Sequence, residues 1–391
     1  MVNGKLTLIG GGHSHLAVLK SLGVRPLNGV CTTLISPETH TPYSGMLPGH
    51  IAGHYDFDQA HIDLRPLSRF AGARFYQTRA VGIDFDNRRV ICAEGAPVEF
   101  DMLSINLGST PSAHGVPGVH EHALPIKPID PFLKKWREWI RQIRTTKSAL
   151  IKVVVVGGGA AGVELALATR HRLLQVLSES GHANLRPEYH LVTASSTILP
   201  THPGSVQSRF ERILGEHRVR IHVNSMVTQV EQGRVHCRSG ATIEFDCLFW
   251  AVNAAPPEWI VESGIETDAE GFVLVNDCLQ SVSHPFVFAA GDVATIRNQP
   301  RPKAGVFAVR QGPVLSENLR LALAGKPLMR FRAQKNFLGL ISTGNRYAIA
   351  SRGRWSIEGR WVWCWKDWID RRWIRQFQKL PGEKAITPRG N

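Results

Sequence analysis

The sequence predicts an α/β protein made of two Rossmann-like units, each with a three-layer ββα architecture, the second inserted into the first, plus a small C-terminal region. Two stretches predict these units: residues 152–166 and residues 5–19 each contain an apolar run, a glycine-rich turn and an alanine- or leucine-rich run. An apolar, β-branched run that ends in glycine is typical of a strand buried on both faces, and the run after the turn is typical of a helix. A chain of 391 residues is long enough for two or three domains.

The turn in the middle of the chain has the spacing Gly157-x-Gly159-x-x-Gly162. The first glycine permits a tight turn, the second lets a pyrophosphate approach the backbone, and the third lets the helix pack close to the strand. The free N–H groups at the start of the helix favour an anion. The motif therefore predicts a dinucleotide site, with a plain glycine-rich turn as the simpler alternative. The next strand ends at Thr193 without an acidic residue that would repel a 2′-phosphate, so the site should tolerate NADPH as well as NADH.

The turn at the start of the chain keeps two of the three glycines. Gly10 and Gly12 match the motif, but His15 stands where the third glycine belongs, so the helix should lie a little further from its strand. The following strand ends at Ser36, a position where an acidic residue usually binds the adenosine ribose. Glu38 is either a substitute for that acid or a solvated loop residue.

The remaining segments divide the chain into parts. Residues 74–99 alternate apolar and polar side chains, as expected of a short β-meander. The strand and turn at 101–111 are repeated at 247–256, where the chain should return to the first unit. We therefore predict an FAD-binding part at 1–150 with a linker helix at 131–147, an NAD(P)H-binding unit at 151–256, the rest of the first unit at 257–325, and a C-terminal region at 326–391.

Composition narrows the class of protein. Hydrophobic residues make up 43% and charged residues 20% of the chain, which is ordinary for a globular protein. No run is apolar enough to span a bilayer and no leader precedes the first strand, so we expect a cytoplasmic protein. The six cysteines show no CxxC or CxxxxC spacing, which argues against a metal site. The net charge of +14 predicts an anionic partner, either nucleotide phosphates or an acidic membrane, whereas nucleic acid is disfavoured because its binding motifs are absent.

The C-terminal region has an unusual composition, because six of the ten tryptophans lie within residues 352–379. On a helix, Trp361 and Trp368 share one side, whereas Lys366 and Asp370 project elsewhere. Tryptophan combined with arginine and lysine is typical of a helix in a membrane interface. We expect this tail to be either a peripheral membrane anchor or a dimer or domain-packing interface.

In their order along the chain, these motifs resemble those of the two-dinucleotide flavoproteins of the pyridine nucleotide-disulfide oxidoreductase superfamily. The resemblance covers nearly the whole chain and rests on Gly10-x-Gly12, the 107–111 turn, Gly157-x-Gly159-x-x-Gly162 and the Gly291-Asp292 pair. Within the superfamily, the 43–53 loop, the 302–312 segment and the tail are most similar to the type II NADH dehydrogenase branch. The stretches 13–15, 40–49 and 365–372 resemble, more closely still, the flavoprotein module found fused to selenide, water dikinase, which suggests a functional link to that enzyme.

The resemblance implies that the first turn binds FAD and that the inserted unit binds NADH or NADPH. Asp292 would then bond the ribityl chain of FAD, and the helix that starts near residues 304–307 would stabilise the reduced flavin. The residues implied at FAD are Gly10, Gly12, His13, Ser14, Ser36, Pro42, Gly108, Ser109, Gly291, Asp292, Gly305, Val306 and Phe307. Those implied at NAD(P)H are Gly157, Gly159, Ala160, Ala161, Gly162, Glu164, Ala251 and Asn253. No catalytic residue is assigned, and the flavin-facing candidates are Pro42, Tyr43 and Gln311.

Departures from the family narrow the activity. The cysteine pair that disulfide reductases need beside the flavin is not found at the required spacing. Type II dehydrogenases carry two glutamines in the quinone-facing helix; here Val306 and Arg310 stand in their places, while Gln311 remains. We expect hydride transfer from NAD(P)H to FAD and electron transfer to a quinone or similar acceptor, by an enzyme peripheral to the cytoplasmic face of the inner membrane. Two alternatives stay open: sulfur or selenium redox chemistry linked to selenophosphate synthesis, and chemistry like that of sulfide:quinone oxidoreductases.

Overall fold

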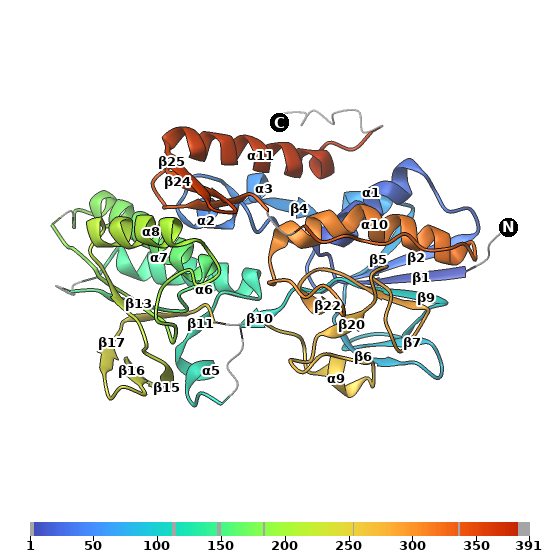
Figure 1. Ribbon diagram of the computed structural model, residues 1–391, viewed down its shortest axis with the longest axis horizontal. Coiled ribbons are helices and arrows are strands. Elements are labelled where there is room, and N and C mark those ends of the chain that lie inside the picture. The colour runs from blue at the N-terminus through green and yellow to red at the C-terminus, as the bar shows by residue number, and fades with distance from the viewer. Residues whose placement is uncertain are drawn as a thin grey trace.

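The computed structural model describes residues 4–111, 115–146, 150–182, 184–252, 254–334 and 337–381. Two α/β bodies lie side by side, one containing β1 (Gly4–Ile9) and the other containing β13 (Glu188–Val192) (Figure 1). The C-terminal helix α11 (Arg360–Gln378) runs along the top of the view. The α/β class predicted from the sequence is therefore confirmed.

The first sheet is parallel and has the strand order β21-β9-β1-β2-β5. Its strands are β1, β2 (Val30–Ile35), β5 (Ala73–Tyr76), β9 (Met102–Ile105) and β21 (Val287–Ala289). Strand β21 follows the second unit in the sequence and pairs with β9, with Phe288 opposite Ser104. Segments before and after the middle of the chain thus build one sheet, which is the predicted insertion.

The second sheet is also parallel, with the order β11-β18-β12-β13-β14. Its strands are β11 (Leu124–Pro125), β12 (Lys152–Val156), β13, β14 (Val219–His222) and β18 (Cys247–Trp250). The valines of β12 are buried on both faces, as expected of a central parallel strand. Strand β11 joins this sheet although it precedes the predicted boundary at residue 151.

Helices cover both sheets. The longer ones are α1 (His13–Val24), α6 (Ile129–Ile143), α7 (Ala160–Glu179), α8 (Gly204–Glu216) and α10 (Gly305–Leu323). The shorter ones are α2 (Leu47–Ile51), α3 (Phe57–Ala60), α4 (Leu64–Phe70), α5 (Val119–His122), α9 (Trp259–Glu262) and the 3-10 turn η1 (Gly291–Val293). Helices α1 and α10 cross closely because Gly312 faces Ala17, where a Cβ on Gly312 would lie 2.6 Å from the alanine Cβ. None of the helices in the described ranges is long and apolar enough to cross a bilayer.

Small sheets complete the structure. The predicted meander is confirmed as the antiparallel set β6 (Ala80–Asp84), β7 (Arg89–Cys92) and β8 (Val98–Glu99). A second antiparallel set consists of β15 (Val227–Glu231), β16 (Arg234–Cys237) and β17 (Thr242–Glu244), and short pairs form between β3 (His40–Pro42) and β4 (His61–Asp63), β10 (Thr110–Pro111) and β19 (Ala254–Ala255), and β20 (Val273–Val275) and β22 (Ala294–Ile296). The tail forms the sheet of β23 (Gly339–Ser342), β24 (Ala348–Arg352) and β25 (Trp355–Gly359), on which α11 packs.

Helix α11 buries one ion pair against the protein and exposes two of its tryptophans to solvent. Lys366 and Asp370 are buried beside Val362, and the Lys366 Nζ lies 2.6 Å from the Asp370 Oδ2. By contrast, Trp361 and Trp368 are 58% and 57% exposed. The buried ion pair is retained because each charge has a partner within the protein.

The glycine turn after β12 depends on close backbone approach. Gly157 has φ +125°, a conformation that side chains rarely adopt. A Cβ on Gly162 would lie 1.8 Å from the Gly157 carbonyl oxygen, so only glycine lets α7 start against this turn. Gly159 differs, because a Cβ there would meet no described atom within 4 Å.

We expect Gly162→Ala to lower the free energy of unfolding by about 1–3 kcal/mol, the usual cost of forcing an extra group into a packed site. The matched control is Gly159→Ser, which has open space and keeps a good N-cap residue for α7, so its stability should stay near that of the wild type. Thermal and urea unfolding of the two variants checks this. Equal stability of the two variants would contradict the close-approach explanation.

Candidate functional site

The first glycine turn lies where β1, β9 and β21 end. The Gly10 N–H donates to the Ile35 carbonyl at 2.8 Å, and the Gly12 N–H donates to the Asn106 carbonyl at 3.2 Å. Gly10 has φ +91°, and a Cβ there would lie 2.6 Å from the Asn106 oxygen. The carboxyl ends of parallel strands are the edge where α/β proteins bind their ligands.

The Asn106 side chain joins three segments at this edge. Its Oδ1 accepts hydrogen bonds from the Ser14 N–H at 2.9 Å and the His15 N–H at 3.0 Å, and its Nδ2 donates to the Ala290 carbonyl at 2.6 Å. The side chain is almost completely buried. It therefore fixes the start of α1 relative to the ends of β9 and β21.

His15, which replaces the third glycine, is a buried structural residue. Its Nδ1 lies 2.6 Å from the Gly10 carbonyl, and its Nε2 lies 2.8 Å from the Ser104 hydroxyl. Burial lowers the pKa of His15 to about 4, so the ring is neutral at neutral pH. Because a carbonyl only accepts, Nδ1 carries the proton and donates, and Nε2 accepts from the Ser104 hydroxyl.

A charged cluster surrounds Asp292 at the end of β21. The Lys127 Nζ lies 2.8 Å from the Asp292 Oδ2 and 3.2 Å from the Ser109 Oγ, and the Ser109 hydroxyl lies 3.3 Å from the same carboxylate oxygen. Burial opposes ionisation of Asp292, but the charge and hydrogen bond of Lys127 hold the pKa of this carboxyl below its ordinary value. Gly108, next to Ser109, has open space where its Cβ would be.

His13 borders this cluster. Its Nε2 is buried and has no hydrogen-bond partner among the described residues. Burial lowers the pKa of His13 to about 4, with Asp292 and Lys127 acting in opposite directions. An unpartnered buried nitrogen beside a glycine turn is the kind of atom that a bound ligand would satisfy. Its neighbour Ser14 is fully buried and donates from Oγ to the Ala308 carbonyl of α10 at 2.7 Å.

The loop after β3 lies between α10 and α11. The Tyr43 ring stacks on Trp373 at a centroid distance of 4.2 Å and meets the His13 ring edge-on at 5.5 Å. Burial, together with the Asp370 carboxylate, raises the pKa of Tyr43. Pro42, which precedes it, is half-buried at the end of β3.

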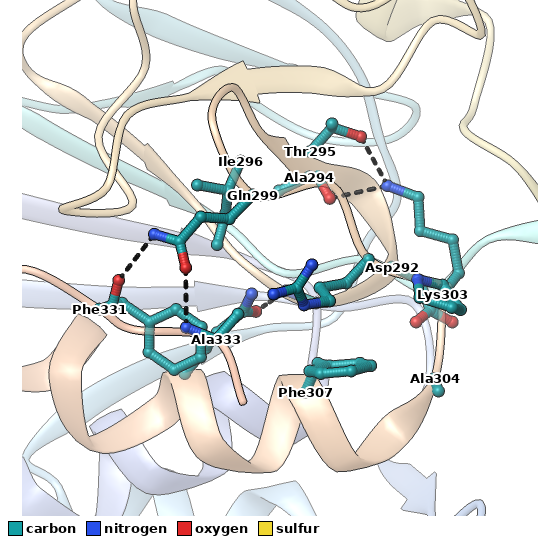
Figure 2. A pocket seen from close by; sticks show the side chains of 14 residues that line it. Asp292, Ala294, Thr295, Ile296, Gln299, Lys303, Ala304, Phe307, Phe331 and Ala333 are labelled. Atoms are coloured by element: carbon teal, nitrogen blue, oxygen red, sulfur yellow. Dashed lines mark hydrogen bonds between the residues drawn. The ribbon is translucent and has the colours of Figure 1, made fainter. Parts of the chain in front are cut away.

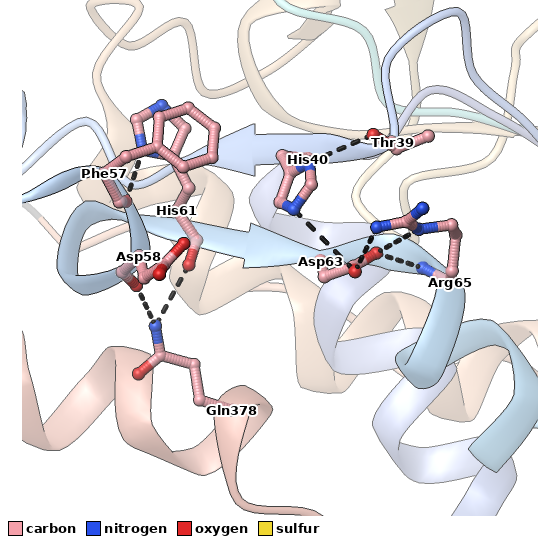
Figure 3. Close-up of polar contacts among 8 residues, drawn as sticks. All are labelled: Thr39, His40, Phe57, Asp58, His61, Asp63, Arg65 and Gln378. Carbon is pink, nitrogen blue, oxygen red and sulfur yellow. Dashed lines mark hydrogen bonds and ion pairs between the residues drawn. The ribbon is translucent and has the colours of Figure 1, made fainter. Parts of the chain in front are cut away.

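The β3–β4 hairpin that carries this loop is held by polar contacts shown in Figure 3. Asp63 accepts two hydrogen bonds from the Arg65 guanidinium and lies 3.7 Å from the His40 Nε2. The Gln378 amide donates to the Asp58 and His61 carbonyls, which ties the end of α11 to the hairpin.

The start of α10 and the Gly291 turn line a hollow. The Gln311 Oε1 accepts from the Gly291 N–H at 2.6 Å, so this flavin-facing candidate positions the turn that carries Asp292. Gly305 faces Ser44, since a Cβ on Gly305 would lie 2.5 Å from the Ser44 Oγ. The next residue, Val306, is half-buried. Figure 2 shows Phe307 and Lys303 on the wall of the hollow, with Lys303 donating to the Ala294 carbonyl and the Thr295 hydroxyl.

The second glycine turn has the same place in the second sheet. The Gly157 N–H donates to the Val192 carbonyl at 2.8 Å, and the Ala251 carbonyl fills the place of a Gly157 Cβ. Ala160 and Ala161 begin α7; its N-cap residue Gly159 provides no side-chain cap, and its first turn contains no acidic residue. Asn253 lies outside the described residues.

Two predicted residues use their polar atoms inside the protein. Glu164 is half-buried and accepts from the Ser342 N–H at 2.7 Å and from the Ser342 hydroxyl at 2.9 Å. Burial raises the pKa of Glu164, while the nearby Lys366 ammonium counters that effect. Ser36, at the end of β2, donates from its hydroxyl to the Glu38 carbonyl at 2.9 Å.

The structure thus brings Gly10, Gly12, His13, Ser109 and Asp292 to one edge of the first sheet, where Asn106 and Lys127 join them. Neither Asn106 nor Lys127 was predicted from the sequence. A polar residue that ends a buried strand, as Asn106 does, is a signal for a site at a strand terminus. Lys127 gave no such signal, because it lies in an irregular segment.

Comparison with known proteins identifies one family whose model covers most of the chain. The model of the family described as pyridine nucleotide-disulphide oxidoreductase matches residues 4–312. The chain is 26% identical over 301 residues to the NADH dehydrogenase-like protein YutJ of Bacillus subtilis, covering 76% of this chain and 78% of that protein. It is 26% identical over 285 residues to the alternative NAD(P)H-ubiquinone oxidoreductase C1 of Arabidopsis thaliana, covering 67% of this chain and 53% of that protein.

A solved structure with a similar fold is NDH2 from Plasmodium falciparum in complex with NADH. It superposes with a TM-score of 0.78 at 15% sequence identity, covering 98% of this chain and 100% of that chain. At this identity the match shows that the fold is shared.

We expect Asn106→Ala to destabilise the protein by at least about 1–3 kcal/mol, the cost of one unsatisfied buried polar group, because it leaves two N–H groups and one carbonyl without partners. Asn87→Ala is the control, since Asn87 is exposed and bonds only Asp84 through its side chain. Urea unfolding measures both. If the two variants unfold alike, Asn106 does not have the structural role described.

Proposed function

Because the chain belongs to the pyridine nucleotide-disulphide oxidoreductase family, whose model matches residues 4–312, we propose that it is an FAD-dependent enzyme that oxidises NADH or NADPH and passes the electrons to a quinone or a similar acceptor. The observation that carries the proposal is the repetition of one site. Each sheet ends in a glycine turn that opens a helix, at the edge where nucleotides bind, and the N-cap residues Gly12 and Gly159 have no side chain that could cap the helix. In the first helix, Asn106 accepts from the Ser14 and His15 N–H groups. A chain with two such sites can hold two dinucleotides.

The first site fits FAD. The unpartnered Nε2 of His13 and the ionised Asp292 offer polar groups to a ligand, and Gly108 leaves space at the strand end. Asp292 would bond the ribityl chain, and the N-terminus of α10, which begins at Gly305, would favour negative charge on the reduced ring. When bound, FAD supplies the redox chemistry, and the protein contributes binding and orientation.

The second site fits a nicotinamide dinucleotide. The uncapped N–H groups of Ala160 and Ala161 would bind its pyrophosphate. The end of β13 carries Thr193, whose Oγ1 accepts from the Ser195 N–H at 3.3 Å, so neither charge nor bulk there opposes a 2′-phosphate. We therefore propose that both NADH and NADPH are accepted.

The acceptor is proposed to enter from the tail side. A hollow between the 48–55 segment, the tail sheet and α11 is lined by Tyr55, Ser342, Trp363 and Lys366 among others. The relative from Arabidopsis thaliana is an NAD(P)H-ubiquinone oxidoreductase by name, which supports a quinone here.

The sulfur and selenium alternatives need a cysteine at the flavin. All six cysteines lie in the described ranges and all are free. Five lie on β2, β7, β16, β18 and α11, and Cys278 lies in the loop between β20 and β21. None of them lines either hollow. No observation therefore favours those alternatives over electron transfer to a quinone.

We further propose that the tail binds a membrane, with the enzyme peripheral to the cytoplasmic face. The tryptophan stripe, defined as Trp355, Trp361 and Trp368, is 52–58% exposed. The Arg372 guanidinium lies 5.4 Å from the Trp368 ring centroid. Exposed tryptophan beside arginine suits the boundary between lipid headgroups and acyl chains, and the net charge of +14 favours anionic lipid. A homodimer through the same stripe is the alternative.

We expect the purified protein to retain FAD and the visible absorbance of the flavin to bleach when NADH or NADPH is added without oxygen. Ala161→Glu should bind FAD normally but be reduced more slowly, because its carboxylate repels the nucleotide phosphates while suiting the helix N-terminus. Ala161→Gln is the neutral control. A flavin that stays oxidised in the wild type would refute hydride transfer.

We expect replacement of the tryptophan stripe by serine to weaken binding to anionic vesicles at least about tenfold, since each buried large apolar side chain contributes roughly 1.5–3 kcal/mol. The matched control replaces Val24, Val261 and Met329, which are 59%, 54% and 50% exposed, by serine and should sediment with vesicles like the wild type. Unchanged vesicle binding, together with loss of a dimer on gel filtration, would identify the stripe as a subunit interface.

A further inference from the structure

Lys127 connects the two sheets. It follows β11, the edge strand of the second sheet, by two residues. Its ammonium nevertheless reaches Asp292 and Ser109, which follow β21 and β9 of the first sheet. Lys127 therefore lies at the junction where two dinucleotides bound to the two sheets would have to meet.

The ammonium is fixed in place but not closed off. Two of its three donors are taken by the Asp292 Oδ2 at 2.8 Å and the Ser109 Oγ at 3.2 Å. Its side chain is 32% exposed, whereas that of Asp292 is 15% exposed. One donor therefore remains for a ligand at this edge.

Two other titratable side chains near Asp292, those of Lys303 and His13, differ from Lys127. Among the described residues no hydrogen bond joins Lys303 to Asp292, because Lys303 donates to the Ala294 carbonyl at 2.7 Å and the Thr295 hydroxyl at 2.8 Å and lies 3.8 Å from the Phe272 ring centroid. His13 is neutral at neutral pH because it is buried. Lys127 is therefore the ammonium group that is bonded directly to Asp292 and Ser109 and that keeps one donor for a ligand at this edge.

We propose that Lys127 is a positioning residue for the flavin redox step: held by Asp292 and Ser109, its ammonium favours the anionic reduced flavin over the neutral oxidised one and so raises the flavin potential. This inference rests on the proposed function, because it requires FAD at the first turn. The physical reason is that a fixed positive charge in a partly buried site stabilises a nearby negative charge more than a neutral group. The residue acts on the equilibrium of the flavin and takes no proton.

The test compares Lys127→Met with Lys127→Arg and with a matched lysine elsewhere. Lys152 is that control, since its Nζ lies 2.6 Å from the Glu244 Oε2 and its side chain is 28% exposed, but it begins β12 at the opposite end of the strand from the nucleotide site. The readouts are the two-electron midpoint potential of the bound flavin, measured against reference dyes, and the Kd for oxidised FAD.

We expect Lys127→Met to weaken reduced FAD about tenfold relative to oxidised FAD, which lowers the midpoint potential by about 30 mV for a two-electron couple. Lys127→Arg should keep the potential within about half of that shift, because the charge remains. Lys152→Met should leave it unchanged. Should Lys127→Met fail to retain FAD, Lys127→Gln carries the same expectation.

An unchanged potential in the uncharged Lys127 variants would overturn the proposal, even if their unfolding temperature falls, because that pattern indicates a purely structural role. The same shift in Lys152→Met would also overturn it, as a general effect of net charge. A wild-type protein that binds no FAD would instead refute the proposed function, so the two failures are distinguishable.

Discussion

The amide of Asn106 is the contact on which the arrangement of the first site depends. Through one side chain, the start of α1, the end of β9 and the end of β21 are held at fixed positions. The Gly291 turn follows directly after Ala290, the residue that accepts from Asn106, and Gln311 secures that turn from the other side. A network of neutral amide groups therefore positions Asp292, and its carboxylate is free to interact with Lys127 and a ligand.

The sequence predicts those features of the fold that repeat at short range. Glycine spacing locates both turns, valine runs locate the buried strands, and alternation locates the β6–β8 meander. Residues that act across long separations were not predicted. Asn106 bonds groups 92 and 184 positions away, and Lys127 bonds Asp292 across 165 positions. No local pattern encodes such pairs, since they depend on how the sheets are assembled.

His15 shows how a motif can be altered without losing its structure. The sequence treats it as a missing glycine, but the imidazole itself bonds the Gly10 carbonyl and Ser104. In the second turn, Gly162 achieves the corresponding approach by having no side chain, with the Gly157 carbonyl in the way of any Cβ. One turn is stabilised by hydrogen bonds and the other by backbone contact, so the same motif position has two different physical solutions.

The ion pair between Lys366 and Asp370 has a further consequence for the whole molecule. It faces inward, and Lys366 also donates to the Gly45 carbonyl, so α11 cannot roll about its axis without separating buried charges. The exposed side chains of Trp361 and Trp368 therefore point in a fixed direction relative to both sheets. Any surface that bound those rings would therefore hold both sheets in one fixed orientation relative to itself.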